Sequence, residues 1–483
     1  MPPPTGPVAK PARARRRGRA TPARAAANMP EILNKLLILI VILTIPVARA
    51  MPPPEPWMRA DWTPSAPRFH DSGLDPQALG NALGHRLLAF RWPAQTTVLP
   101  GAGGPHTFAN AQYVSAVARL DIPARQGLRL LHDFDNYKNL FPLMTESSVE
   151  AQDGRNVITR NRIELPLPVA SFKMDFRVKN RIEDDGSVAS MLVDGQASSA
   201  LAMLGGASES LRDQPSLSRA EIIPLDAGHC LIVFTWWERY ELTSWIALMV
   251  QREYPEIVEL TPYIAVAGAL EAIREKYSFP DDSRETTSPP EYSDFNGLQN
   301  IVERYSAWGP VVILHPEPGL HAPGSSYLRY VSVAGRLHRS LDDSRRQLTS
   351  YSRLPEALPE IRKVSASPQG QDTDLALQLH IGLSVIGFPL DLGLHNHWNN
   401  PARLDFTRTS GDLARLYGSC EWQAEGQDTL LIATSADSID QHAPWLLGMF
   451  HHMIEQVPYA GEITLMVVQE IALLRLEKWV GKG

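Results

Sequence analysis

The sequence predicts an α+β protein of two tandem domains, each a curved antiparallel sheet wrapped around a long C-terminal helix. The first observation is a repeat, because Tyr113–Leu120 (Tyr-Val-Ser-Ala-Val-Ala-Arg-Leu) returns in the second half of the chain as Tyr330–Leu337 (Tyr-Val-Ser-Val-Ala-Gly-Arg-Leu). A fixed long period indicates two copies of one domain. The second observation is that, in each copy, a series of alternating strand patterns with short turns precedes a long helical pattern.

The offset between the repeated strands also pairs Gly80 with Gly297 and Pro93 with Pro310. Each copy has about 200 residues, which is enough to bury a core of its own. A segment rich in Pro, Ser and charge, without apolar periodicity, predicts the linker between the copies. The predicted parts are an extended arm at 51–72, a first domain at 73–279, the linker at 280–293 and a second domain at 294–483.

The elements of the first copy follow from apolar periodicity and from its turn residues. A helix is expected near 75–90, and the proline that follows the repeated strand opens a short helix at 124–133. A second short helix ends at Pro142, and the strands are separated by turn signals such as Asp153-Gly154. The predicted strands are 95–99, 112–121, 146–152, 155–165, 171–183, 187–196, 217–225 and 229–240. Two helical segments, 243–253 and 256–277, close the copy.

The second copy keeps this order. A strand at 328–338 is followed by short helices up to Pro359, and strands follow between 361 and 436. Helical segments at 441–456 and 461–480 complete it. Because the turns are short, neighbouring strands are expected to be antiparallel.

One strand in each copy alternates apolar and polar residues, which predicts one apolar sheet face and one solvent-exposed face. In the first copy, Phe172, Met174 and Phe176 alternate with charged residues, and in the second copy Phe388, Leu390 and Leu392 repeat the pattern. An apolar face that encloses a cavity would line a hydrophobic ligand, whereas the alternative is an ordinary filled core.

The helical segments before the closing helices carry Trp and Met at matching places. Adaptable Met beside aromatic rings suits an irregular hydrophobic ligand or a membrane surface, and predicts a lid or docking helix. Core packing is the alternative. Together with the strand residues, these positions form the candidate ligand-binding set: Phe172, Met174, Phe176, Trp236, Trp245, Met249, Phe388, Leu390, Leu392, Trp445, Met449 and Phe450.

The segment Asp133-Phe-Asp-Asn-Tyr-Lys-Asn-Leu-Phe-Pro142 resembles the START-like (SRPBCC) superfamily, particularly its polyketide cyclase and coenzyme-Q-binding branch. Lys138 stands where that branch usually has proline, and the second copy, with Ser350–Pro359, departs further. The resemblance implies two helix-grip domains, each with a deep apolar cavity for a lipid, sterol, quinone or polyketide. It also implies that no metal or other cofactor is needed, and it supplies no catalytic residue.

Charge is distributed unevenly along the chain. The net charge is −7, yet residues 1–50 carry nine basic side chains and one acidic one, so residues 51–483 have a net charge of −15. An acidic body is poorly suited to a phosphate backbone, and we expect no nucleic-acid partner.

Residues 36–47 form an apolar run that is short for a membrane span, with Lys35 before it and Ala48-Arg49-Ala50 after it. This pattern is typical of a secretory signal peptide and predicts a periplasmic or secreted protein, with translation starting at Met1 or Met29. The alternatives are an anchor through residues 36–47 and an organellar transit peptide.

Polar motifs give no recognisable catalytic set. His395, His397 and the pair His451-His452 are candidate zinc ligands without a third ligand at a recognisable spacing. Cys230 and Cys420, the two cysteines, occupy different places in the copies, which predicts buried free thiols.

The leading hypothesis is a non-catalytic, exported protein that binds and transfers a hydrophobic molecule such as a lipid, sterol or quinone, with transient membrane contact. One alternative is a polyketide cyclase or aromatase, for which Arg160, Arg162 and Tyr137 are the available proton-transfer groups. The other is an envelope assembly protein with filled cavities.

Overall fold

The computed structural model describes residues 53–481 apart from 167–170, 200–208, 211–214, 240–250, 279–283, 327, 384–385, 442, 444 and 458. The predicted leader, with its apolar run at 36–47, lies outside these residues. From Pro54 onward the chain is one compact unit. No helix within the described ranges has the length and apolar character needed to cross a membrane.

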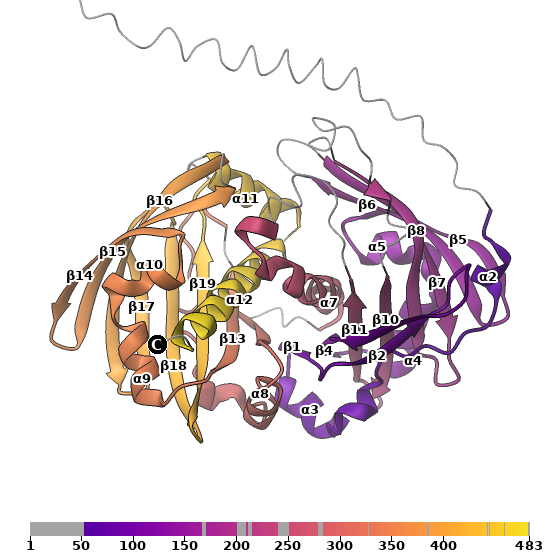
Figure 1. Ribbon diagram of the computed structural model, residues 1–483, viewed down its shortest axis with the longest axis horizontal. Helices are drawn as coiled ribbons and strands as arrows, with labels where there is room; N and C mark the ends of the chain where they lie inside the picture. Colours follow the sequence, from indigo (N-terminus) through magenta and orange to yellow (C-terminus); the bar gives the residue numbers. More distant parts are fainter. Residues whose placement is uncertain are drawn as a thin grey trace, which may run out of the picture. The chain divides into compact units, whose positions relative to one another are not determined.

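The strands of both copies belong to one antiparallel sheet (Figure 1). From one edge, the first copy contributes β5 (Met144–Asp153), β6 (Asn156–Pro166), β7 (Ser171–Ile182), β8 (Val188–Ser199), β10 (Ser216–Pro224), β11 (Cys230–Glu238), β4 (Val114–Leu120) and β1 (Leu87–Arg91). The second copy continues with β12 (Val311–Pro318), β13 (Arg329–Leu337), β19 (Asp428–Ser438), β18 (Arg415–Glu425), β17 (Arg403–Gly411), β16 (Ile386–Asn400), β15 (Asp372–Leu383) and β14 (Ile361–Gln369). The short β9 (Glu209–Ser210) pairs with β8, and β2 (Gln95–Leu99) pairs with β3 (His106–Ala111) in a separate hairpin.

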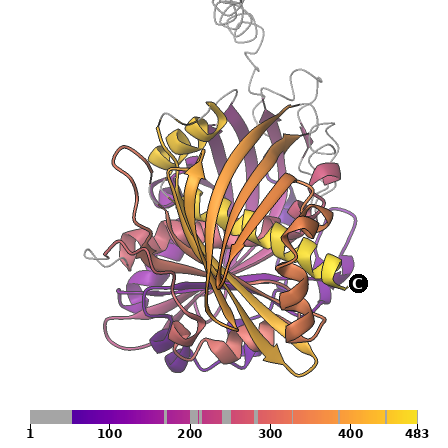
Figure 2. The same cartoon turned by 90° about the vertical axis from the view of Figure 1, so that its left-hand side faces the viewer.

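The helices follow the same order in both copies. The first copy has α3 (Pro76–Leu83), α4 (Ala124–His132), η3 (Phe134–Asn136), α5 (Tyr137–Leu140) and α7 (Glu256–Tyr277). The second has α8 (Gln299–Tyr305), α9 (Leu341–Leu348), η6 (Tyr351–Arg353), α10 (Leu354–Ala357), α11 (Trp445–Gln456) and α12 (Ala460–Val480). Figure 2 shows α12 crossing the strands of the second copy. An antiparallel sheet around a C-terminal helix, present twice, confirms the predicted α+β fold of tandem helix grips.

The central strands are covered on both faces. A core on one face contains residues of α7 and α12, and a second core on the other face contains residues of α3 and α8. All five residues of β1 are buried, as are the first six of β12. The sequence of a strand that is buried on both faces is a continuous apolar run rather than an alternation of apolar and polar residues. This explains why the period-two pattern marks the outer strands, such as β7 and β16, and not β1 or β12.

Each copy contains a buried row of three hydrogen-bonded polar side chains, called a polar ladder below. In the first copy, Trp92 Nε1 donates to Ser115 Oγ at 2.7 Å, and Ser115 Oγ lies 2.6 Å from Thr235 Oγ1. In the second copy, His315 Nε2 lies 2.7 Å from Ser332 Oγ, which lies 2.7 Å from Thr434 Oγ1. Burial holds the pKa of His315 well below its usual value, so the ring is neutral.

These ladders correct the offset expected from the sequence. Ser115 and Ser332 keep the offset of the repeated strands, but Trp92 and His315 are six positions further apart. The starts of α3 and α8 show the same larger offset as Trp92 and His315. The pairing of Gly80 with Gly297 and of Pro93 with Pro310 is therefore wrong. The second copy has six fewer positions between the corresponding strands than the first, whose extra length lies in the region of the β2–β3 hairpin.

A second difference lies in the predicted helix at 75–90. The helix α3 ends at Leu83, and Gly84, with φ of 54°, turns the chain into β1. A positive φ favours glycine because it has no Cβ. The strands β1, β3 and β12 were absent from the sequence prediction, whereas α7 has the predicted bounds.

The helices α7 and α12 contact each other through charged groups. Arg475 and Lys478 of α12 lie 3.3 and 3.4 Å from the carboxylate of Glu256 on α7. Near the other end of α7, Arg329 of β13 lies 3.1 to 3.4 Å from three carboxylates, those of Glu271, Glu275 and Glu462. The carboxylate of Glu271 is also paired with Arg274.

Glu462 is almost fully buried, and this burial raises its pKa to about 7, with a further contribution from Glu271 that the attraction of Arg329 opposes. The folded protein therefore holds a proton that the unfolded chain releases near pH 4.5. The contribution of Glu462 to stability should fall by about 3 kcal/mol as the pH rises from 4.5 to 7. We expect Glu462→Gln to remove this loss, measured by urea unfolding at pH 5 and pH 8.

The matched control is Glu259→Gln, a change of the same kind at a carboxylate that is 54% exposed on α7. This variant should keep the pH dependence of the unmodified protein. Equal pH dependence in the unmodified protein and in Glu462→Gln would contradict the assignment.

Candidate functional site

The inner face of the second copy carries an apolar cluster. Leu390 and Leu392 of β16 are 3% and 7% exposed and share a buried cluster with Leu447 and Ile454 of α11. The cross-strand neighbours of Leu390 and Leu392 on β15, Leu379 and Leu377, are half-buried and pack against it. Two of the predicted site residues thus lie in a buried apolar cluster next to α11.

A groove of about 740 Å³ adjoins this cluster. Val364, Leu377, Leu392 and Gly411 lie opposite one another on β14 to β17 and line it in one row. The rest of the lining comes mainly from polar residues of the same strands and from η6 and α10: Ser352, Pro355, Arg362, Lys363, Ser365, Ala376, Gln378, Asp391, Gly393 and Ser410. This volume is in the range of small-molecule sites, and the lining combines the apolar row with polar side chains.

In the first copy, Met174 and Phe176 of β7 are half-buried. The opposite face of this strand differs from the expected solvent-exposed face, because Arg177 and Lys179 are 1% and 0% exposed. Lys179 Nζ donates to the carbonyl oxygens of Ala60 at 2.5 Å and Trp57 at 3.3 Å. The N-terminal arm therefore covers this face of β7.

The arm is held by apolar contacts as well. Met58 of α2 (Pro56–Arg59) is 2% exposed and packs with Ile158 and Val193 of the sheet. Burial lowers the pKa of Lys179 to about 8. The alternation of β7 did not show this, because it predicts which residues share a face but not what covers that face.

Trp236 of β11 is half-buried and packs against the core that contains α7, and its Nε1 donates to Glu238 at 3.1 Å. Trp245 and Met249 lie outside the described residues. Phe172 lies in β7, Phe388 in β16, and Trp445, Met449 and Phe450 in α11. The structure describes the backbone of these five residues but not their side chains.

Two of the three proton-transfer candidates, Tyr137 and Arg162, are held by structural contacts. The hydroxyl of Tyr137 donates to the carbonyl oxygen of Leu131 at 2.5 Å, and burial raises its pKa well above the usual value. Arg162 pairs with Glu146 and with Asp175. Arg160 is half-buried, and among the described residues its Nε has no hydrogen-bond partner.

The four histidines considered as zinc ligands each lie beside one or more acidic side chains. His395 Nδ1 lies 2.8 Å from Asp374, and His397 Nδ1 lies 2.5 Å from Asp372 on the neighbouring strand. His451 and His452 of α11 both face Glu455. No group of three or more potential metal ligands occurs in the part of the chain that the structure describes.

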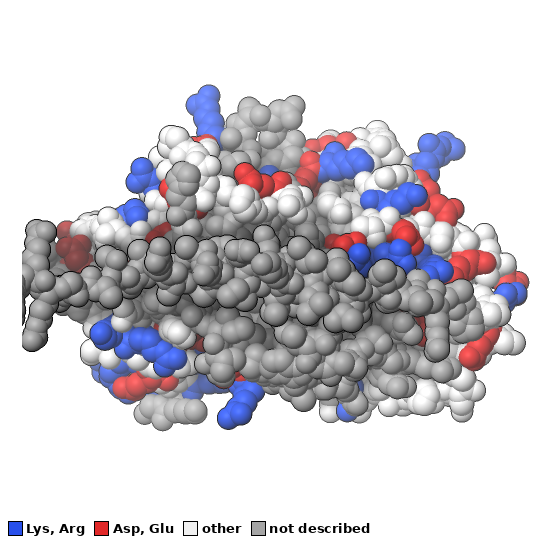
Figure 3. Space-filling view, turned by 90° about the horizontal axis from the view of Figure 1, so that it is seen from above, with Lys and Arg blue, Asp and Glu red and all other residues white. Residues whose placement is uncertain are grey.

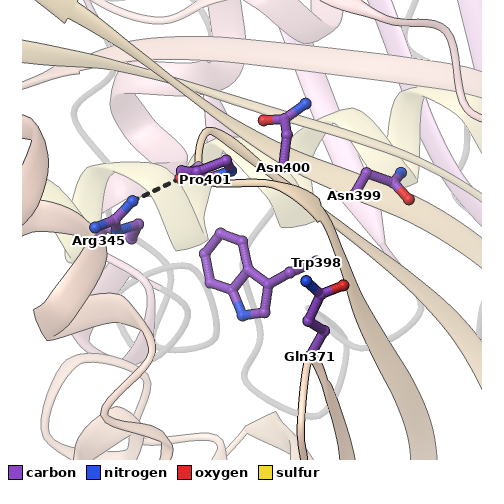
Figure 4. A pocket seen from close by; sticks show the side chains of 6 residues that line it. All are labelled: Arg345, Gln371, Trp398, Asn399, Asn400 and Pro401. Carbon is purple, nitrogen blue, oxygen red and sulfur yellow. Dashed lines mark hydrogen bonds between the residues drawn. The ribbon is translucent and has the colours of Figure 1, made fainter.

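A second, smaller pocket of about 380 Å³ lies at one end of the strands of the second copy (Figure 4). It is lined by Arg345 of α9, Gln371 of the β14–β15 turn, Trp398, Asn399 and Asn400 of β16, and Pro401. Sequence reasoning missed this pocket and most of the groove. Besides the alternation of β16 that marked Leu392, the alternation Leu375-Ala-Leu-Gln-Leu379 was an available signal for the groove.

Charged side chains of both signs lie on the described surface, although residues 51–483 have a net charge of −15. On the face shown in Figure 3, basic and acidic side chains lie beside one another. The many ion pairs of the described residues agree with this mixing, as in the pairs of Arg155 with Asp184 and of Lys173 with Glu164.

Comparison with known proteins gives structural likeness only. No protein-family model and no curated protein sequence matches the chain. The solved structure of the di-domain ARO/CYC StfQ from the steffimycin biosynthetic pathway is 9% identical, covers 76% of this chain and 98% of its own, and has a TM-score of 0.27. A START superfamily protein from Mycobacterium smegmatis is 14% identical over 34% of this chain and 96% of its own, with a TM-score of 0.25. A STAR-related lipid transfer protein from Xanthomonas axonopodis is 15% identical over 38% of this chain and 97% of its own, with a TM-score of 0.23.

These TM-scores and identities are low, so the helix-grip assignment rests on the strand order and the helix positions described above. The resemblance noted in the sequence is to the same superfamily as the second and third of these proteins.

The two cysteines are free thiols, as predicted. Burial raises the pKa of Cys230 to about 11 and that of Cys420 to about 12, so neither is a thiolate at neutral pH.

Because the thiolate is the reactive form, we expect neither cysteine to react with iodoacetamide at pH 7.5 in the folded protein. Both should react in guanidinium chloride, as counted by mass spectrometry. Rapid labelling of either one before unfolding would show that its surroundings open in solution.

Proposed function

We propose that the second copy binds a hydrophobic small molecule, of lipid, sterol or quinone type, along the groove of β14 to β17. The observation that carries the proposal is the row of Val364, Leu377 and Leu392, which lines about 740 Å³ beside a buried apolar cluster. A ligand that buries about 400 Å² of apolar surface gains roughly 10 kcal/mol before ordering costs. Binding of this strength requires no catalytic group.

Several features support a carrier more than an enzyme. The candidate proton-transfer groups Tyr137 and Arg162 are held by structural hydrogen bonds and ion pairs. The groove lining offers one carboxylate, Asp391, two cations, Arg362 and Lys363, and no histidine or cysteine. A polyketide cyclase remains the alternative that the fold itself accommodates.

We further propose that the protein is exported and exchanges its ligand at a membrane surface. Support comes from the sequence, through the apolar run at 36–47 and the Trp and Met pattern of residues 445–450. Fusion of residues 1–50 to a reporter enzyme in a bacterial host tests export. Retention of the reporter in the cytosol would contradict it.

The groove is tested by Leu377→Asp, which places a carboxylate in the row that lines it. Burying a leucine side chain contributes about 1.5 to 3 kcal/mol, so binding of the neutral fluorescent probe N-phenyl-1-naphthylamine should weaken about tenfold or more. Mass spectrometry of solvent extracts should also find a co-purified hydrophobic molecule in the unmodified protein and less of it in the variant.

The matched control is Val468→Asp, which also replaces an aliphatic side chain by a carboxylate, on α12 at a residue that is 58% exposed. Thermal unfolding shows whether each variant is folded. Equal probe binding by folded Leu377→Asp and by the unmodified protein would exclude the groove as the site. Absence of both a co-purified molecule and probe binding would exclude the carrier function.

A further inference from the structure

The pocket around Trp398 is a built site with a rigid aromatic centre. The ring of Trp398 stacks on that of Trp422, with centroids 5.5 Å apart and an angle of 28° between the planes. Trp422 is 2% exposed and belongs to the buried core, whereas Trp398 is half-buried. Trp422 therefore supports the ring of Trp398, which lines the pocket. Figure 4 shows the indole in the midst of the other lining side chains.

The rim of the pocket supplies hydrogen-bonding groups that are not used by the fold. Among the described residues, neither the indole N–H of Trp398 nor the carboxamide of Gln371 has a hydrogen-bond partner, and Gln371 is exposed. Asn400 uses its Oδ1 to accept from the backbone N–H of Ala402 at 2.8 Å, which leaves its NH₂ group directed elsewhere. A carboxamide offers both a donor and an acceptor.

The charge in the pocket is already balanced. Arg345 Nη1 donates to the carbonyl oxygen of Pro401 at 2.8 Å, and its Nη2 lies 3.2 Å from Asp342. Asn399 donates to Asp405. An anionic ligand would meet Asp342 beside Arg345, and a cationic ligand would meet Arg345 itself. The pocket therefore favours a neutral ligand.

The same place in the first copy has no such arrangement. Leu128 is the counterpart of Arg345 at the offset of the repeated strands, and its side chain lies so close to Gly186 of the β7–β8 turn that a Cβ there would be 2.9 Å from it. His132 Nε2 lies 2.8 Å from the carbonyl oxygen of Gly186. In the first copy, a leucine and a histidine close onto the turn, whereas in the second copy an arginine reaches the turn beside a half-buried tryptophan.

We propose that this pocket binds the ring of a neutral sugar, either free or as the headgroup of a lipid. A sugar ring has an apolar C–H face that fits an indole, and hydroxyl groups that both donate to and accept from carboxamides. The volume of about 380 Å³ suits a small polar ligand of this size class. The site is separate from the groove of β14 to β17, and neither proposal depends on the other.

Isothermal titration calorimetry of the full chain tests the proposal with methyl α-D-glucopyranoside, methyl α-D-mannopyranoside and N-acetyl-D-glucosamine, and with sodium acetate as an anion. We expect at least one sugar to bind with a Kd of about 1 mM or below. Gln371→Ala should weaken this binding about tenfold, because it removes an exposed carboxamide without affecting the core. Trp398→Ala should abolish it.

The matched control is Gln369→Ala, the same change at an exposed residue of β14 outside the pocket. It should bind as the unmodified protein does. Phosphatidylcholine vesicles with and without a glucosyl diacylglycerol form a second arm, which distinguishes a headgroup from a free sugar. The proposal is overturned if no sugar and no glycolipid binds, if acetate binds more tightly than every sugar, or if Gln371→Ala binds as the unmodified protein does.

Discussion

The antiparallel pairing of β1 with β12 is the interaction on which the rest of the structure depends. Leu87, Leu88 and Ala89 lie opposite Leu314, Ile313 and Val312. Without this pairing, each copy would end in an apolar edge strand with unpaired N–H and C=O groups, which is a known route to aggregation. With it, both edges are satisfied, and the strands at the junction can be buried on both faces. The helices α7 and α12 then pack against each other over one face of the joined sheet.

This junction also decides where pockets can form. The central strands are filled by core side chains on both faces, so an open site can form only toward the outer strands. In the second copy the groove lies along β14 to β17, and the Trp398 pocket lies at the turn end of β14 to β16. The packed centre gives both sites a rigid support, since β13 and β19 hold the outer strands in register.

Much of the fold was predictable because the signals that mark it are local. Alternation and turn residues located β5 to β8 within a few residues, and in the second copy they marked only the region 361–436 that holds β14 to β19. The alternation of β16 marked Leu390 and Leu392, which lie in the buried cluster that the groove adjoins. The junction strands were missed because a strand buried on both faces has no alternation, and a run such as Leu87-Leu-Ala-Phe90 is equally compatible with a buried helix. Tertiary packing, which periodicity does not specify, brings residues of η6, α10 and β14 to the groove. It also buries Lys179 beneath the N-terminal arm. The uniform offset failed because the first copy inserts the β2–β3 hairpin where the second has a shorter connection.

The register of β1 and β12 has one more consequence. Ala89 and Val312 are as far apart in the sequence as the corresponding residues Trp92 and His315, so they are equivalent positions of the two copies. They lie opposite each other in the pairing of β1 with β12. The equivalent positions of the two copies therefore meet at the centre of the junction, which is the arrangement of an isologous interface in a symmetric homodimer. A single copy with such an edge would be expected to dimerise about a two-fold axis. The duplicated chain has both halves of that interface in one polypeptide, so association no longer depends on concentration, and the two halves are free to diverge in sequence.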